Sequence, residues 1–151
     1  ALFWLFRADS PFYIKPRLSW DLIRWLLRFA GCSTKAHLAH ATRALVHGHC
    51  HQKAFDTMGD LVRTVNLVPG LEAETIASGC CGMAGAFGYE AGNYDISMTM
   101  GEIGLFPAVR GASSDTLIVA SGTSCRHQIR DGAGREAVHV ARVLEKALGN
   151  K

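Results

Sequence analysis

The chain has 151 residues, a length that suits one domain built on one hydrophobic core. Apolar residues make up 48% of it and charged residues 19%, a globular composition that excludes a disordered chain. The net charge of +3 comes from scattered lysines and arginines, so the sequence predicts no surface for nucleic acid.

The N-terminus and the apolar stretches of the sequence indicate the location of the protein in the cell. The N-terminus lacks a basic region followed by an apolar run and a cleavage site, so we predict a cytoplasmic location with reduced thiols. The most apolar stretch, residues 20–30, is broken by Asp21, Arg24 and Arg28 and is shorter than the ~20 residues of a membrane span. The chain begins at Ala1 and not at a methionine, from which we expect either a fragment of a longer protein or an engineered chain.

Residues 1–45 differ in character from the rest and are predicted to form an N-terminal helical segment. Its first helix should start at Trp20, with Ser19 as the cap, and end at Gly31. Apolar residues cover much of its circumference, so we expect this helix to be buried or to bind a partner. A second, short helix is predicted over residues 35–43.

Three β-α units follow one another from residue 44 onward, and the domain that they form is assigned to residues 46–151. Strands are predicted over 44–47, 74–78 and 116–121, and helices over 52–65, 89–106 and 135–148. Six apolar residues should form the buried face of the first of these helices: Ala54, Phe55, Met58, Leu61, Val62 and Val65. Alternating strands and helices predict an α/β fold with a small parallel sheet and right-handed crossovers.

The loop after each predicted strand contains cysteine. These loops read HGHCH (47–51), SGCCGMAGAFG (78–88) and GTSCRHQ (122–128). In an open parallel sheet, the loops after the carboxyl ends of the strands share one edge. We therefore predict that four cysteines converge on one metal centre: Cys50, Cys80, Cys81 and Cys125. Two of them, Cys50 and Cys125, should lie shortly before helices, where a low thiol pKa favours the thiolate that binds iron or zinc.

Two other roles are open to the cysteine-bearing loops. The cysteines could be buried core residues, but adjacent cysteines framed by glycines are poor core filler, which favours metal binding. The glycine-rich loop could instead cradle a phosphate, but its glycine spacing matches neither the dinucleotide fingerprint nor the phosphate-binding loop. Cys32 lies outside the pattern and is predicted to be a packing residue.

Three histidines near the cysteines are further candidates. His49, His51 and His127 could ligate metal, carry protons or contact a substrate carboxylate, and the alternative is that they are merely solvated. The other four histidines are predicted to be bystanders: His37, His40, His47 and His139. Arg126 either pairs with a substrate acid or lies on the surface.

The cysteine pattern closely resembles the CCG, or cysteine-rich, domain of heterodisulfide reductase and of related iron–sulphur oxidoreductases. That pattern has one cysteine, a Cys-Cys-Gly some thirty-odd residues later, and then a C-x-x-C. Cys50, the run Cys80-Cys81-Gly82, and Cys125 match it, whereas Gly122 replaces the first cysteine of the final pair. The resemblance thus implies a four-cysteine [4Fe-4S] cluster, with zinc as the alternative.

Three sequence motifs are similar to the C-terminal tail of FAD-linked D-2-hydroxyglutarate and D-lactate dehydrogenase-like oxidases: HGHCHQKA, SGCCGMAGAFGYE and GTSCRHQI. This resemblance implies an electron-transfer domain that works beside flavin and ferredoxin-like domains and is not catalytically active alone. FAD is expected only in the full-length parent, because no G-x-G-x-x-G follows a strand here. The alternative is a non-catalytic zinc-binding structural or interface domain, and homo-oligomer formation stays open.

The N-terminal segment carries a second resemblance. SPFYIKPRLSWDLIRWLLRFAGCS is similar to a stretch of D-amino-acid dehydrogenase-type flavoproteins. On that basis, the chain would join pieces of two flavoenzyme families near residues 44–47.

Overall fold

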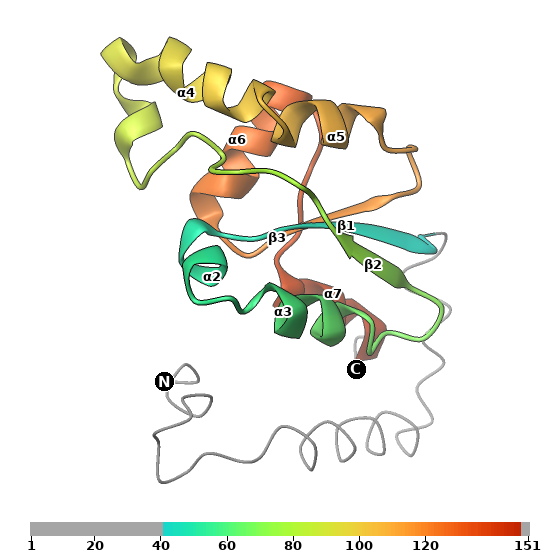
Figure 1. The fold of residues 1–151 in the computed structure, drawn as a ribbon. Helices are drawn as coiled ribbons and strands as arrows, with labels where there is room; N and C mark the ends of the chain where they lie inside the picture. The colour runs from blue at the N-terminus through green and yellow to red at the C-terminus, as the bar shows by residue number, and fades with distance from the viewer. Residues whose placement is uncertain (1–40, 149–151) are drawn as a thin grey trace, which may run out of the picture. The chain divides into compact units, whose positions relative to one another are not determined.

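The structure is a computed structural model that describes residues 41–148 (Figure 1). The helix predicted to start at Trp20 lies outside these residues, as do Cys32, His37 and His40. Most of the helix predicted over 35–43 also lies outside them. Its last residue, Arg43, belongs to a β-strand, so the prediction is wrong at that end.

A small parallel sheet forms the centre of the described domain. Its strands are β1 (Arg43–His47), β2 (Glu72–Thr75) and β3 (Leu117–Ala120), in the order β2-β1-β3. The predicted α/β fold with a parallel sheet is confirmed. The second strand starts and ends earlier than the predicted range of 74–78, whereas the other two lie within one residue of prediction at each end.

Both faces of the sheet are covered, which explains why its strands are apolar. Along β1, Ala44 and Val46 belong to one hydrophobic cluster, whereas Leu45 packs against the other. In β3, Ile118 and Val119 divide between the same two clusters in the same way. Because side chains alternate between faces, one short apolar run contributes to two cores.

Helices form a layer on each side of the sheet (Figure 1). On one side lie α3 (Met58–Val65) and α7 (Val140–Leu148), and on the other α4 (Tyr94–Glu102), α5 (Leu105–Gly111) and α6 (Thr123–Ala133). The short helix α2 (Cys50–Ala54) follows directly on the end of β1. No helix within residues 41–148 is long and apolar enough to cross a membrane.

The helix predicted over 52–65 is wrong in one respect, because the structure divides it into α2 and α3. Asp56 has a φ of 52°, in the left-handed region, and interrupts the helix there. Leu61 and Val65 are buried as predicted, but Ala54 and Phe55 lie before the break and are exposed, Phe55 by 71%. A hydrophobic pattern that continues across a break therefore predicts the wrong environment for Phe55.

The other two predicted helices also need correction. The range 89–106 begins at the last residue of a 3-10 turn, η3 (Phe87–Tyr89), and contains a second one, η4 (Ala91–Asn93), before α4 and the start of α5. The range 135–148 is helical only from Val140, because Val138 pairs with Val119 beside the sheet.

Helix α6 is not predicted by the sequence, because its polar composition is typical of a loop. It nevertheless buries Cys125, Gln128 and Ile129, which lie three and four residues apart on one helical face. That spacing is the signal from which the helix could have been found.

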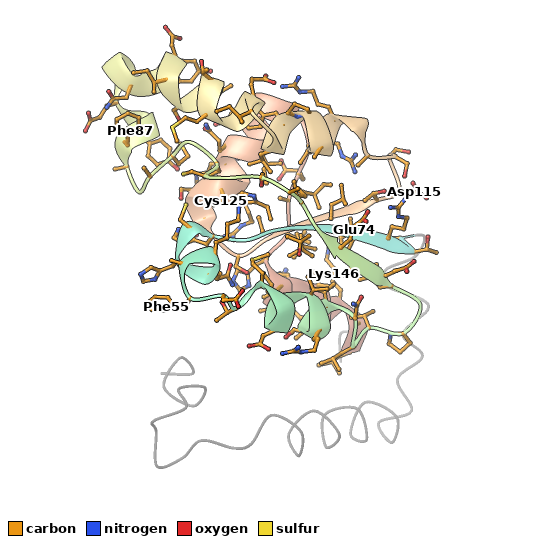
Figure 2. All side chains as sticks on the ribbon, in the orientation of Figure 1. Phe55, Glu74, Phe87, Asp115, Cys125 and Lys146 are labelled. Atoms are coloured by element: carbon orange, nitrogen blue, oxygen red, sulfur yellow. The ribbon has the colours of Figure 1, made fainter. Side chains whose placement is uncertain are left out.

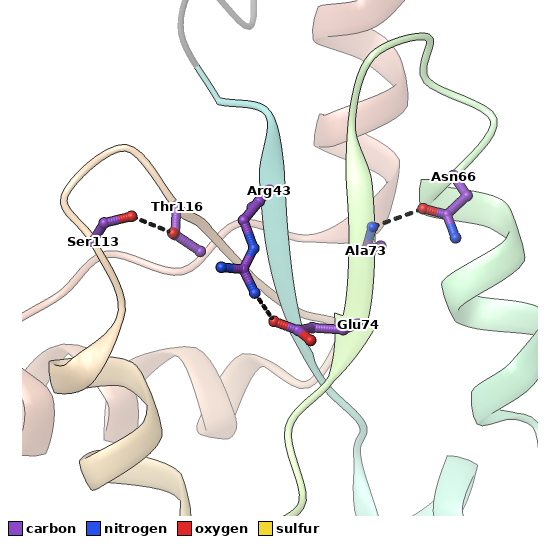
Figure 3. Close-up of polar contacts among 6 residues, drawn as sticks. All are labelled: Arg43, Asn66, Ala73, Glu74, Ser113 and Thr116. Carbon is purple, nitrogen blue, oxygen red and sulfur yellow. Dashed lines mark hydrogen bonds and ion pairs between the residues drawn. The ribbon is translucent and has the colours of Figure 1, made fainter.

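Polar contacts tie the sheet to its surroundings near the amino ends of the strands (Figure 3). The guanidinium of Arg43 lies 2.6 Å from the Glu74 carboxylate, which joins β1 to β2. Asn66, just after α3, accepts a hydrogen bond of 2.7 Å from the backbone N–H of Ala73 in β2. An exposed ion pair such as Arg43–Glu74 contributes only about 0–1 kcal/mol. The stability of the sheet therefore comes mainly from its apolar faces.

Candidate metal centre

The cysteine-bearing segments lie at the carboxyl ends of the three strands, as predicted. His47 ends β1 and Cys50 begins α2, while Cys80 and Cys81 lie in the loop after β2. Cys125 lies in the first turn of α6, directly after β3 (Figure 2). Both Cys50 and Cys125 are therefore inside helices and not ahead of them, which corrects their predicted positions.

Cys50 and Cys80 form an outer pair, the more accessible half of the group. The thiol of Cys50 lies 3.4 Å from Cys80 Sγ. Cys50 is exposed and Cys80 half-buried. The backbone N–H of Gly82 donates to Cys80 Sγ over 3.3 Å. A sulphur that already receives a backbone N–H is suited to carry negative charge.

Cys81, Cys125 and His47 form an inner group that is almost completely buried. Their exposed fractions are 2%, 1% and 0%. One ligand atom from each lies within 4.8 Å of the others, a spacing that could hold a metal ion. His47, which we predicted to be a bystander, thus lies among the cysteines.

The electrostatics of the inner group oppose full ionisation. A hydrogen bond from the Cys125 thiol lowers the pKa of Cys81, because it stabilises the Cys81 thiolate. The same hydrogen bond, together with burial and the neighbouring thiolates, raises the pKa of Cys125. Burial and the contact with Cys80 also raise the pKa of Cys50, so the low pKa predicted for Cys50 and Cys125 is wrong. In the absence of metal, Cys125 and Cys50 therefore favour the protonated form. A bound cation would displace these protons.

Lys53 places a positive charge beside the cysteines. Its ammonium donates to the backbone oxygens of Ser78 and Gly79, at 2.6 and 2.5 Å, and so ties α2 to the loop before Cys80. Burial lowers the pKa of Lys53, whereas the negative charges of the four cysteine thiolates act to raise it. One ammonium thus interacts electrostatically with the whole group of thiols.

The three histidines predicted as candidate ligands have other partners. His49 caps α2, where its Nδ1 accepts a hydrogen bond of 3.3 Å from the N–H of His51. The ring of His51 packs edge-on against Phe55. His127 Nδ1 lies 2.6 Å from the hydroxyl of Tyr89. None of the three belongs to the compact ligand group found within the described residues.

Arg126 closes the turn that brings Cys125 into the site. Its guanidinium donates to the backbone oxygens of Ala120 and Ser121, at 3.0 and 2.9 Å. It also donates to the hydroxyl of Thr123, at 3.2 Å. We predicted that Arg126 either pairs with a substrate acid or lies on the surface. Neither role includes these contacts with the backbone, which are structural.

A buried polar contact that the sequence did not predict supports the Cys-Cys-Gly loop. Gln128 Nε2 donates to the backbone oxygen and the hydroxyl of Ser97, at 3.1 and 2.9 Å. Gly82 packs against the same group and has a φ of 100°, and a Cβ there would collide with the Ser97 backbone oxygen. The signal in the sequence was the spacing of Gln128, three residues after Cys125 on one helical face.

The replacement Gly82→Ala is therefore expected to destabilise the domain by roughly 2–5 kcal/mol, from the left-handed conformation and the clash together. Two glycines of the same region separate these causes. Gly85→Ala, at a φ of 74° with nothing within 4 Å, should cost only about 1–2 kcal/mol. Gly79→Ala meets nothing within 4 Å and has no positive φ, so it should change stability by less than about 0.5 kcal/mol. Chemical denaturation of the three variants measures this order, and equal losses would contradict it.

Gly122 lies against the inner group. A Cβ at this position would be 2.8 Å from Cys125 Sγ and 2.7 Å from the ring of His49. The residue that breaks the C-x-x-C pattern is thus next to a predicted ligand, and a side chain there would displace its neighbours.

Comparison with known proteins identifies homologues among dehydrogenases. The chain is 31% identical over 109 residues, 70% of its length, to a subunit of the anaerobic glycerol-3-phosphate dehydrogenase of Escherichia coli (strain K12). It is 33% identical over 75 residues to D-2-hydroxyglutarate dehydrogenase of the same strain, and 36% identical over 75 residues to that of Pseudomonas putida. The matched segments cover 26% of the glycerol-3-phosphate dehydrogenase subunit and 7% of each D-2-hydroxyglutarate dehydrogenase. No family model and no solved structure matches the chain.

Proposed function

We propose that this chain is an iron–sulphur electron-transfer domain of a dehydrogenase, in which Cys50, Cys80, Cys81 and Cys125 hold one [4Fe-4S] cluster. The observation that carries the proposal is the gathering of four thiols, from the segments that follow the three strands, at one edge of a parallel sheet. Similarity to a glycerol-3-phosphate dehydrogenase subunit and to D-2-hydroxyglutarate dehydrogenases supports the same class of function.

The donor set of the structure fits such a group. Iron–sulphur clusters are held by thiolates, and here the hydrogen bond to Cys81, burial and the neighbouring thiolates raise the pKa of Cys125, a thiol that a cluster would stabilise in ionised form. The Gly82 N–H to Cys80 and the Lys53 ammonium would offset part of the negative charge. Met83, 2% exposed, helps to exclude water from the inner side. When bound, the cluster would accept and release single electrons.

The rest of the proposed role depends on domains beyond this segment. We place the chain beside flavin and ferredoxin-like domains of a D-2-hydroxy-acid dehydrogenase-like parent, with FAD bound there and not here. The flavin would take a hydride from the substrate, and the cysteine domain would pass electrons onward. The chain would accordingly not oxidise substrate alone, and we expect it in the cytoplasm.

A zinc-binding structural domain is the second candidate. Two thiolates and an imidazole within 4.8 Å, with an outer thiol close by, match the ligand types of a tetrahedral Cys₃His zinc site. Such a site would stabilise the fold or an interface without redox chemistry.

Metal analysis under anaerobic conditions separates these functions. After reconstitution with ferrous iron and sulphide, we expect about four iron and four sulphide per chain and broad absorbance that bleaches on reduction. Stoichiometric zinc, with no iron uptake and no redox signal, would select the structural role. A chain that binds neither metal would contradict both functions.

A further inference from the structure

His47 is a buried polar residue with one unused ring nitrogen. It ends the central strand and is 0% exposed. Within residues 41–148, two buried side-chain polar atoms have no hydrogen-bond partner: His47 Nε2 and Ser121 Oγ. An unsatisfied buried polar atom costs about 1–3 kcal/mol, a cost that a charged sulphur or a metal ion beside the ring would offset.

The other ring nitrogen is held in place. His47 Nδ1 lies 3.0 Å from the hydroxyl of Ser78, a residue of the loop that leads to Cys80. Histidines that ligate metals usually use one nitrogen in such a contact, because it fixes the tautomer and the direction of the ring. The Ser78 contact therefore leaves Nε2 as the nitrogen available for a ligand.

The surroundings of the ring identify the kind of ligand. A ring nitrogen of His47 lies within 4.8 Å of the sulphurs of Cys81 and Cys125, and no Asp or Glu of the described residues joins this group. Lys53, a cation beside the thiols, donates to backbone oxygens of the neighbouring loop. A thiophilic metal bound by Cys81 and Cys125 would be within reach of the imidazole.

We propose that His47 is a ligand of the metal centre, so that the donor set contains one imidazole nitrogen besides the four thiolates and one iron of the cluster has two protein ligands. This inference rests on the proposed function, because it needs the cysteines to hold a metal. His47 would bind on the buried side with Cys81 and Cys125, while Cys50 and Cys80 complete the centre from the exposed side. Ser78 acts as a positioning residue that orients the imidazole.

Nitrogen coupling to the reduced cluster tests this directly. We expect pulsed electron paramagnetic resonance of the reconstituted wild-type chain to show one strongly coupled nitrogen. Labelling with ¹⁵N-histidine should change that signal. The replacement His47→Phe, which keeps a ring of similar size, should remove it, whereas His51→Phe at an exposed position should retain it. The labelled wild-type measurement stands even if the His47 variant folds poorly.

Cobalt(II) binding to the metal-free chain gives a readout independent of the cluster. Ser78→Ala should weaken cobalt binding by about 10–100-fold and His47→Phe by at least as much, with the thiolate-to-cobalt absorption band preserved. An assembled cluster with only weak nitrogen coupling would overturn the assignment of His47 and leave the proposed function intact. If the wild-type chain takes up neither iron nor cobalt, the proposed function fails, and the role of His47 fails with it.

Discussion

Replacing Cys81 with serine is expected to abolish the metal centre. Cys81 is 2% exposed, and a hydrogen bond from Cys125 lowers its pKa, so its sulphur cannot be replaced by water or by a nearby exposed side chain. A serine hydroxyl is a much poorer ligand for iron or zinc than a thiolate. We expect iron and sulphide contents at background after anaerobic reconstitution, and Cys125→Ser should behave in the same way.

The outer pair and the remaining cysteine provide graded controls. Cys50 is exposed, so Cys50→Ser should yield a centre that forms in part and is lost faster in air. Cys32→Ser, outside the predicted site, should retain the full iron content. Equal iron contents in the Cys81 and Cys32 variants would show that the buried pair does not hold the metal.

The cost of burying charge explains why the Cys81 and Cys125 variants should lose more iron than the Cys50 variant. Several thiolates close together repel one another, and burial adds a further penalty for each. In the metal-free chain, the hydrogen bond to Cys81 contributes most to the raised pKa of Cys125, and burial contributes most to that of Cys50, with repulsion among the thiolates adding to both. A metal offsets this penalty most for the buried sulphurs, because water already screens the exposed ones.

The topology and the position of the cysteines could be predicted because both depend on local patterns. The apolar run of β3 indicates a strand covered on both faces, and three repeated β-α units indicate a parallel sheet. Once the sheet is parallel, the loops that carry Cys50, Cys80 and Cys125 must share an edge. Neither step required knowledge of side-chain contacts.

The burial of His47 could not be predicted, because it depends on the strand order. The sequence places it at the end of a strand and the start of a loop, where histidines are usually solvated. Its burial follows from the position of β1 between β2 and β3 and from the return of Cys81 and Cys125 over it. The same holds for Gln128 and Ser97, whose contact joins α6 to α4 across 31 residues of sequence.

The replacement Phe106→Ala is expected to cause the largest loss of stability, about 3–5 kcal/mol. Phe106 is 0% exposed and lies in α5, within the cluster that also contains Cys81 and Cys125. Its ring fills the space next to two glycines, because a Cβ at either Gly101 or Gly132 would collide with it. Backbones that pack this closely around the ring cannot collapse far into the cavity that alanine would leave.

Phe55→Ala is the matched control, because it removes the same side chain from a position that is 71% exposed. We expect it to change the free energy of unfolding by less than about 0.5 kcal/mol, as is usual for surface substitutions. Urea denaturation of the metal-free chain measures both variants without interference from the metal centre. Similar losses in the two variants would mean that the ring of Phe106 is not enclosed between α4 and α6. The helix that carries Cys125 would then need another support, since Gly132 lies in that helix and the Phe106 ring is what packs against it.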